Sequence, residues 1–218
     1  MYTISELLGM KSYAPKNLAP VVVKTLEPGV NSAVISAEAA MYEKRVIVFD
    51  TEVTRESANC LQTLLLHLHS EGKEKITIHI SSPGGDVVEG LAMLAILQWV
   101  KEQGVIIETF CRGMAASMAS LLLMCGTKGH RSMLEDSTCL IHDLSSGNQG
   151  KFKDLQVNME YTIELRNRLL NIVSKRTGKD IEWIKTNWFN GTDHMLFGDK
   201  ALEEGVIDKV IRVDYGKC

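Results

Sequence analysis

Three short segments of this chain carry residue types that could together cleave an acyl bond. Ser117 lies between small residues in Gly113–Ala119, directly after the strand-like run Val105–Phe110. A Pro-Gly-Gly turn ends at Gly85, and His142 follows a further apolar run. A serine hydroxyl is a weak nucleophile, so it needs a base within hydrogen-bond reach and donors for the developing oxyanion. In this order the segments supply a nucleophile, an oxyanion-binding loop and a general base.

The backbone next to Ser117 suits this chemistry. A strand-to-helix transition leaves the first N–H groups of the helix free, and these groups carry partial positive charge. The Met118 N–H would lie beside the reacting centre, and Gly85, at the carboxyl end of a strand, offers a second N–H. Each piece alone also has a plainer explanation: a helix cap for the serine, a simple turn for the glycines and a structural role for His142.

The elements that must position these residues alternate along the chain. The sequence predicts strands at Arg45–Phe49, Ile76–Ile80, Val105–Phe110, Thr138–His142 and Val206–Val213. It predicts helices, from apolar residues three and four apart, at Glu56–His69, Val88–Val100, Ser117–Met124, Phe152–Arg176 and Ile181–Trp188. Gly178 is placed to end the longest helix in a left-handed turn. Short strands alternating with longer helices indicate an α/β domain with a largely parallel sheet.

The first forty-four residues lack this regularity, because prolines and Gly29 interrupt them. We expect an N-terminal arm over residues 1–44, with a short strand at Val21–Val23, and one domain over residues 45–218. A chain of 218 residues and 24.2 kDa is large enough for a single substantial core. No linker or internal repeat divides it.

Composition excludes several classes of protein. The hydrophobic share is 45%, the charged share 23% and the formal net charge −3, so no basic excess points to nucleic acid or to a membrane surface. No apolar run is long enough to span a bilayer, and no signal peptide is expected at the N-terminus. The five cysteines lack paired or CxxC spacing, which predicts reduced core residues of a cytoplasmic protein.

Several separated motifs, taken in order, are far more specific than any one of them. They are Ser82-Pro-Gly-Gly-Asp86, Gly113–Ala119, Ile141-His142, Gln149-Gly150, Thr177-Gly178 and Ala201–Asp208. On these motifs, from about Arg45 to Val213, the chain resembles the Clp protease proteolytic subunit family (ClpP). The resemblance implies stacked β-α-β units of the ClpP/crotonase type, with a protruding handle made of a strand and the long helix at about 152–176.

By the same resemblance, Ser117 corresponds to the family nucleophile and His142 to its general base. Gly85 and Met118 correspond to the oxyanion donors. The third member of the triad has four candidates by residue type: Asp143, Asp180, Asp193 and Asp199. Counting back from Gly205–Asp208 places the family's triad aspartate on Asp193, whereas counting forward from Thr177-Gly178 reaches Gly191. We choose Asp193, which is the acid near both counts. Asp143 adjoins the base, and neighbours on a strand point to opposite faces.

The resemblance implies a serine endopeptidase that hydrolyses unfolded proteins or peptides inside stacked heptameric rings. It implies no metal and no organic cofactor in this chain, with ATP used only by an AAA+ unfoldase partner. The helix from Phe152 would form the handle between rings, with Lys153, Glu160, Glu164 and Arg168 exposed, although its pattern equally suits an ordinary amphipathic surface helix. The histidines elsewhere do not make a metal-ligand constellation; they are His67, His69, His79, His130 and His194.

This chain departs from the family in two places. Members usually follow the active histidine with Gln-Pro, whereas here Asp143-Leu144 follows it, which frees the local backbone and adds a negative charge near the base. The first forty-four residues do not match the family region that forms the axial gate and docks the unfoldase.

Three alternatives therefore stay open. The divergent arm leaves room for a phage-type relative acting in capsid maturation. A crotonase-like acyl-CoA enzyme also pairs a helix start with a Gly-rich oxyanion loop, but such enzymes usually employ carboxylates rather than a Ser/His pair. A non-catalytic ring subunit is the third alternative, and the complete set of Ser117, His142 and Asp193 argues against it.

Overall fold

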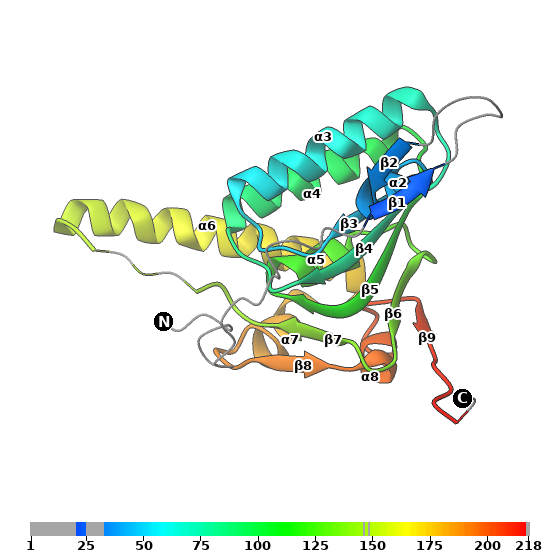
Figure 1. Ribbon diagram of the computed structural model, residues 1–218. Helices are drawn as coiled ribbons and strands as arrows, with labels where there is room; N and C mark the ends of the chain where they lie inside the picture. The colour runs from blue at the N-terminus through cyan, green and yellow to red at the C-terminus, as the bar shows by residue number, and fades with distance from the viewer. Residues whose placement is uncertain (1–20, 25–32, 146, 148, 217–218) are drawn as a thin grey trace.

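The structure, a computed structural model, describes residues 21–24, 33–145, 147 and 149–216 (Figure 1). Its helices and strands follow in chain order: β1 Val21–Lys24, β2 Ala33–Ser36, α2 Ala37–Tyr42, β3 Val46–Phe49, α3 Arg55–Glu71, β4 Ile76–Ser82, α4 Val87–Glu102, β5 Ile107–Ala116, α5 Met118–Met124, β6 Arg131–Leu134, β7 Thr138–Ile141, α6 Phe152–Thr177, α7 Ile181–Asn187, β8 His194–Leu196, α8 Gly198–Glu203 and β9 Lys209–Ile211. The predicted α/β class is confirmed.

The main sheet divides at β5. Strands β3, β4, β5, β6 and β9 pair in parallel in that order. The first half of β5 pairs with β6, with Thr109 opposite Arg131, and its second half pairs with β7, with Ala116 opposite Leu140. Strand β8 adds to the free side of β7 in the antiparallel direction. One strand thus carries both branches, and its last residues lead directly to Ser117.

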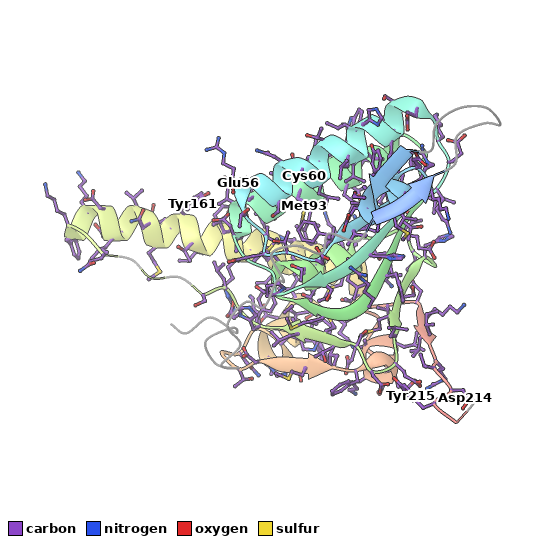
Figure 2. The ribbon with its side chains drawn as sticks, in the orientation of Figure 1. Glu56, Cys60, Met93, Tyr161, Asp214 and Tyr215 are labelled. Carbon is purple, nitrogen blue, oxygen red and sulfur yellow. The ribbon has the colours of Figure 1, made fainter. Side chains whose placement is uncertain are left out.

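Helices α3 and α4 lie side by side on the sheet (Figure 1). The buried residues of α3 are Ala58, Leu61, Leu65 and Leu68, at the predicted spacing of three and four. Met93 of α4 is fully buried, whereas Glu56 and Cys60 lie on the outer surface of α3 (Figure 2). This packing holds β4 and β5, and with them the two loops that carry the candidate site.

Helix α6 divides into a packed half and a protruding half (Figure 1). Leu169, Leu170 and Val173 are buried against the body of the molecule. The protruding half exposes Phe152, Val157, Met159, Tyr161 and Ile163, each by more than half; Tyr161 is labelled in Figure 2. The apolar side predicted for this helix is therefore only partly used within one chain.

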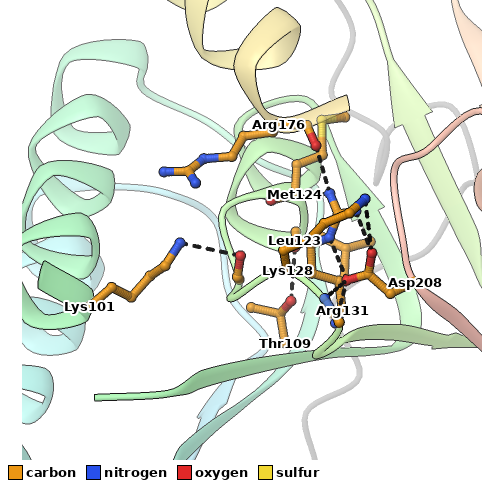
Figure 3. Close-up of polar contacts among 10 residues, drawn as sticks. Lys101, Thr109, Leu123, Met124, Lys128, Arg131, Arg176 and Asp208 are labelled. Carbon is orange, nitrogen blue, oxygen red and sulfur yellow. Dashed lines mark hydrogen bonds and ion pairs between the residues drawn. The ribbon is translucent and has the colours of Figure 1, made fainter. Parts of the chain in front are cut away.

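A buried ion pair ties the end of α6 to the C-terminal segment (Figure 3). Arg131 is 1% exposed, and its Nη2 and Nε donate to Asp208 at 2.7 and 2.8 Å. Its Nη1 donates to the Arg176 carbonyl oxygen at 3.0 Å. Burial by itself would raise the pKa of Asp208, but the hydrogen bonds and charge of Arg131 outweigh it and hold that pKa well below its usual range.

Lys101 ties the end of α4 to the end of α5 by hydrogen bonds to backbone carbonyl groups (Figure 3). Its Nζ donates to the carbonyl oxygens of Cys125 and Gly126 at 2.8 and 3.3 Å, where a helix leaves carbonyls without partners. Burial, together with the nearby charge of Arg176, lowers the pKa of Lys101 to about 8.

The structure confirms most predicted elements and corrects several boundaries. Strand β5 runs on to Ala116, and α5 begins at Met118, so Ser117 belongs to neither element. Gly178 has φ 78° and ends α6, as predicted. Elements α2, β2, β6, β8 and α8 were not predicted. The described residues between β7 and α6 form no strand, so the expected strand of the handle is absent from them. Among the described helices, none is both long enough and apolar enough to cross a membrane.

Candidate active site

Ser117 stands in a strained turn between β5 and α5. Its backbone has φ 54° and ψ −124°, a conformation that non-glycine residues rarely adopt. The Ser117 N–H donates to the Leu140 carbonyl oxygen at 2.9 Å, which fixes the turn on β7. Ser117 occupies the N-cap position of α5, but its side chain makes no capping hydrogen bond. The plain explanation of this serine as a helix cap is therefore wrong, and the hydroxyl has no partner among the described residues.

The glycine loop packs directly against this turn. Val53 holds it from both sides, because the Val53 N–H donates to the Gly84 oxygen at 2.7 Å and the Val53 oxygen accepts from the Asp86 N–H at 2.8 Å. Gly84 has φ 86°, and a Cβ there would lie 2.7 Å from Ser117 Cβ and 2.9 Å from the Met118 nitrogen. Only glycine permits this approach.

Two backbone N–H groups beside Ser117 are free to act as donors. Neither the Gly85 N–H nor the Met118 N–H donates to an acceptor within the described ranges of the chain. Gly85, Ser117 and Met118 line the same cavity. The two donors predicted from the sequence are therefore both next to the serine and uncommitted.

Three neighbouring strands bring the predicted triad residues to one edge. Strand β5 leads into Ser117, and β7, paired in parallel with Ala116 opposite Leu140, leads into His142. Strand β8 runs the other way, with His194 opposite Ile141. Extending this register by one residue sets Asp193 opposite His142. Opposite residues of an antiparallel pair have Cα atoms about 4.5–5.5 Å apart.

His142 is half-buried and lines the same cavity as Ser117. In the described part of the chain, no hydrogen bond joins His142 to Ser117 or to Asp193, and the Asp193 side chain is exposed. Catalytic hydrogen bonds are often long in enzymes without substrate and tighten when substrate binds.

The four aspartate candidates have different partners. Asp180 caps α7 by accepting from the Glu182 N–H at 2.8 Å. Asp199 forms an ion pair with Arg212, which follows β9, and Asp143 forms an ion pair with Arg166. Asp193 is the one candidate that has no hydrogen bond or ion pair with any described residue. Of the four candidates, Asp193 is thus the one whose carboxylate is not committed to another described residue.

The cavity has a volume of about 290 Å³ and is mostly apolar away from the serine. Its apolar lining is made of Pro83, Val87, Met118, Leu121, Leu144, Leu169 and Phe189. Asp143 also lines the cavity, with its charge paired to Arg166. An apolar substrate side chain could be buried beside Ser117, with its carbonyl near the two free N–H groups.

Sequence reasoning missed three parts of this arrangement. It assigned Gly85 but overlooked Gly84, whose close packing on Ser117 depends on the fold. It placed the Asp143 charge near the base without finding Arg166, which is 23 residues away on another element. It also missed Phe189 as a wall of the cavity. No local pattern marks any of the three.

The remaining histidines do not form a metal centre within the described ranges. His194 Nε2 lies 2.9 Å from Thr192 Oγ1 and 3.1 Å from Asn190 Oδ1, so it helps to hold the loop before β8. No group of three or more His, Cys, Asp or Glu side chains that could hold a metal ion was found in the part of the chain that the structure describes.

Comparisons with known proteins point to one family. The family model described as Clp protease matches residues 30–214, so the similarity begins before Arg45. A curated relative, the ATP-dependent Clp protease proteolytic subunit 1 of Prochlorococcus marinus (strain MIT 9312), is 36% identical over 195 residues. That alignment covers 89% of this chain and 96% of the relative.

Proposed function

This chain belongs to the Clp protease family, and from that premise we propose that Ser117, His142 and Asp193 carry its serine peptidase activity. The protein is a Clp-type serine endopeptidase, a hydrolase that acts on proteins and assembles as a ring-like homo-oligomer. The proposal concerns which residues perform the reaction and how the assembly works.

The reaction begins when His142 takes the proton of the Ser117 hydroxyl as Oγ attacks a peptide carbonyl carbon. The Gly85 and Met118 N–H groups donate to the oxyanion that forms. The protonated His142 then gives its proton to the leaving amine, and the C–N bond breaks to leave an acyl-enzyme. Water, deprotonated by His142, attacks the ester; the C–O bond breaks, the acid leaves, and His142 returns the proton to Ser117 Oγ, while Asp193 holds the imidazole in the required tautomer.

The observation that carries this proposal is the Ser117 turn. Strained backbone at a non-glycine residue persists only where the surrounding structure holds it, and such residues cluster at active sites. Here the strained residue bears an uncommitted hydroxyl in a cavity shared with His142 and two free N–H donors. A structural serine would need none of these features.

The assembly is proposed as two stacked heptameric rings that enclose the active sites. Support comes from α6, because its protruding half exposes apolar side chains that one chain leaves uncovered. ATP would act only through an AAA+ unfoldase partner, in keeping with the name of the curated relative. No metal or organic cofactor is needed in this chain for the reaction described.

A cytoplasmic location is part of the proposal. Cys111, Cys125 and Cys139 are buried and unpaired, and burial raises the pKa of each thiol. Such thiols are inert core residues rather than precursors of disulfides.

The test is active-site labelling. The assembled protein is treated with a fluorophosphonate probe, and the adduct is located by mass spectrometry, with Ser117→Ala as the control. We expect one adduct, on Ser117, that is absent from the variant. A folded ring that stays unlabelled, also in the presence of a candidate unfoldase, would contradict the proposal and favour a non-catalytic subunit.

A phage-type maturation protease is the remaining alternative within the family. It differs in its substrate rather than in its chemistry, so labelling does not separate the two. Degradation of an unfolded model protein such as casein, compared with processing of a single capsid-like precursor, does.

A further inference from the structure

An arginine of the long helix holds the carboxylate that follows His142. Arg166 Nε donates to both oxygens of Asp143, at 2.8 and 3.0 Å, and Arg166 Nη2 donates to Asp143 Oδ2 at 2.8 Å. The Leu144 N–H adds a bond to Asp143 Oδ1 at 2.7 Å. The two side chains are 30% and 22% exposed, so water screens the pair only in part. A forked contact of this kind fixes orientation as well as distance.

The same guanidinium reaches a second wall of the cavity. Arg166 Nη2 donates to the Phe189 carbonyl oxygen at 3.1 Å, and its central carbon lies 5.9 Å from the centroid of the Phe189 ring. Phe189 is 4% exposed and lines the cavity together with Leu144. One side chain of α6 therefore joins the segment after His142 to the segment after α7. Hydrogen bonding to Asp143 raises the pKa of Arg166, which keeps the guanidinium charged.

Asp143 follows His142 directly in sequence, and Arg166 of α6 pairs with it. On the strands and loops around His142, the charged or titratable groups are Asp143 on its own segment, Asp193 and His194 at β8, Glu108, Cys111 and Arg112 on β5, Cys139 on β7, and Glu52 and Asp86 at the glycine loop. Of the charged side chains of α6, Arg166 is the one bonded to this segment. Arg112 is itself paired with Asp50. Helix α5 contributes no charged or titratable side chain.

We propose that Arg166 is a positioning residue for the peptidase reaction, acting through Asp143 and Phe189. It holds two walls of the substrate cavity in place and neutralises the carboxylate next to the base. This inference rests on the proposed triad, since it concerns the surroundings of His142 acting as general base.

Two effects follow from this arrangement, and they can be measured separately. Without Arg166, the negative charge of Asp143 would favour the protonated imidazole of His142, which cannot act as a base. The acidic limb of the pH profile of kcat/KM would then move to higher pH, by about half a unit for one unpaired surface-type charge beside the base. Loss of the forked contact would also loosen the cavity walls, and small misplacements of this kind cost on the order of tenfold or more in rate.

The experiment compares four variants by peptide hydrolysis across pH, on samples whose ring assembly is verified by sedimentation velocity. Arg166→Gln should lower kcat/KM about tenfold and move the acidic limb upward by about half a pH unit. Asp143→Asn leaves an unpaired cation and should move the limb downward. The double variant removes both charges, so its limb should return to the wild-type position while kcat/KM stays low. Arg166→Lys keeps the positive charge but cannot make the forked contact with Asp143. Its kcat/KM should therefore fall, while the acidic limb of its pH profile stays at the wild-type position.

Arg212 offers a matched control. It also pairs with a carboxylate, Asp199, with Nη2 2.6 Å from Oδ1, but it lies outside the cavity. Arg212→Gln should therefore match the wild type in both readouts. If Arg166→Gln assembles and also matches the wild type, the inference is overturned. If that variant fails to assemble, Asp143→Asn decides: a lowered limb supports the inference and an unmoved limb overturns it.

The two proposals fail in different ways. If the wild type is labelled at Ser117 but the Arg166 and Asp143 variants behave like Arg212→Gln, the proposed function stands and the role of Arg166 is rejected. A wild-type protein that is not labelled at Ser117 loses the proposed function itself.

Discussion

The Ser117 N–H donates to the Leu140 carbonyl oxygen at 2.9 Å, so the serine turn is fastened to the strand that leads into His142. The pairing of β5 with β7 thereby fixes where the proposed nucleophile, Ser117, lies relative to the proposed base, His142. Asp193 joins the same edge through the register of β7 with β8. Three strands from separate parts of the chain thus determine one constellation.

Gly84→Ala should disable the site without unfolding the protein. The new Cβ would meet Ser117 Cβ and the Met118 nitrogen, which displaces an oxyanion donor. Loss of one such donor typically costs about 10²–10³ in kcat. Peptide hydrolysis and circular dichroism measure the two properties. Gly104→Ala is the matched control, because Gly104 has φ 91° with nothing within 4 Å of its Cβ position. Equal losses in both variants would show that backbone strain, rather than contact with Ser117, is responsible.

Asp193→Asn should lower kcat by about 10²–10⁴, because an amide at this position favours the wrong tautomer of the base. Labelling of Ser117 should slow in parallel. Asp180→Asn is the control, since asparagine can still cap α7 and that residue has no contact with the base. If Asp193→Asn keeps wild-type kcat, the site works as a Ser/His pair and the aspartate assignment fails.

Asp208→Asn should destabilise the fold by about 3–5 kcal/mol, because it leaves the buried Arg131 charge without its partner. The shift of the urea midpoint measures this loss. Folding lowers the pKa of Asp208, so its stabilisation is present above the ordinary carboxyl value of about 3.9 and is lost as pH falls below it. The surface pair supplies the comparison: Asp199→Asn should cost less than about 1 kcal/mol. Equal effects would mean that the Arg131 pair is no stronger than a surface contact.

Lys101 should titrate near pH 8 in the folded protein. After reductive methylation with ¹³C-formaldehyde, one lysine methyl resonance should shift with that midpoint and should be missing in Lys101→Arg. Between about 8 and about 10.4 the folded state binds fewer protons than the unfolded state, so the free energy of unfolding should rise with pH across this window. A titration midpoint above pH 10 would contradict the burial of this ammonium group.

If the rings stack through α6 as proposed, paired substitution of Tyr161 and Ile163 by lysine should separate them without disturbing the fold. Both side chains are more than half exposed, and they belong to the half of α6 that protrudes from the body of the molecule, where a partner would have to cover them. Sedimentation velocity should show a species of half the wild-type mass. Lys153→Ala is the control, because it leaves the apolar surface unchanged. An unchanged mass for the paired variant would exclude this half of α6 from the contact between rings.

Periodicity was sufficient for the elements whose burial pattern is regular. Helix α3 buries residues three and four apart and strand β4 buries every second residue, as their sequences indicate, and both were predicted. Strand β6 was not predicted, because it begins with Arg131, and a charged residue does not indicate a buried strand. The Arg131 charge is buried because Asp208 pairs with it. Strand β8 has three residues and exists because β7 lies beside it.

The candidate site divides in the same way. Ser117, His142 and Gly85 stand in motifs that can be found in the linear sequence. The end of β5 could not be found, because Gly113–Ala116 has the composition of a turn and becomes strand only by pairing with β7. Asp193 was reached by counting, and the commitments of the other three aspartates became visible only in the fold. Arg166 has no local signal, since its partner is defined by how α6 lies against the loop.

Because Ser117 has a positive φ, replacing it by glycine would stabilise the turn but remove the hydroxyl that the proposed reaction needs. Glycine would adopt this turn without strain, whereas a side chain there costs about 1–3 kcal/mol. A library of this chain selected for thermal resistance alone would therefore be drawn toward glycine at position 117, and one selected for peptide cleavage would be drawn back to serine. Directed evolution of a more robust peptidase has to find its gains elsewhere in the molecule.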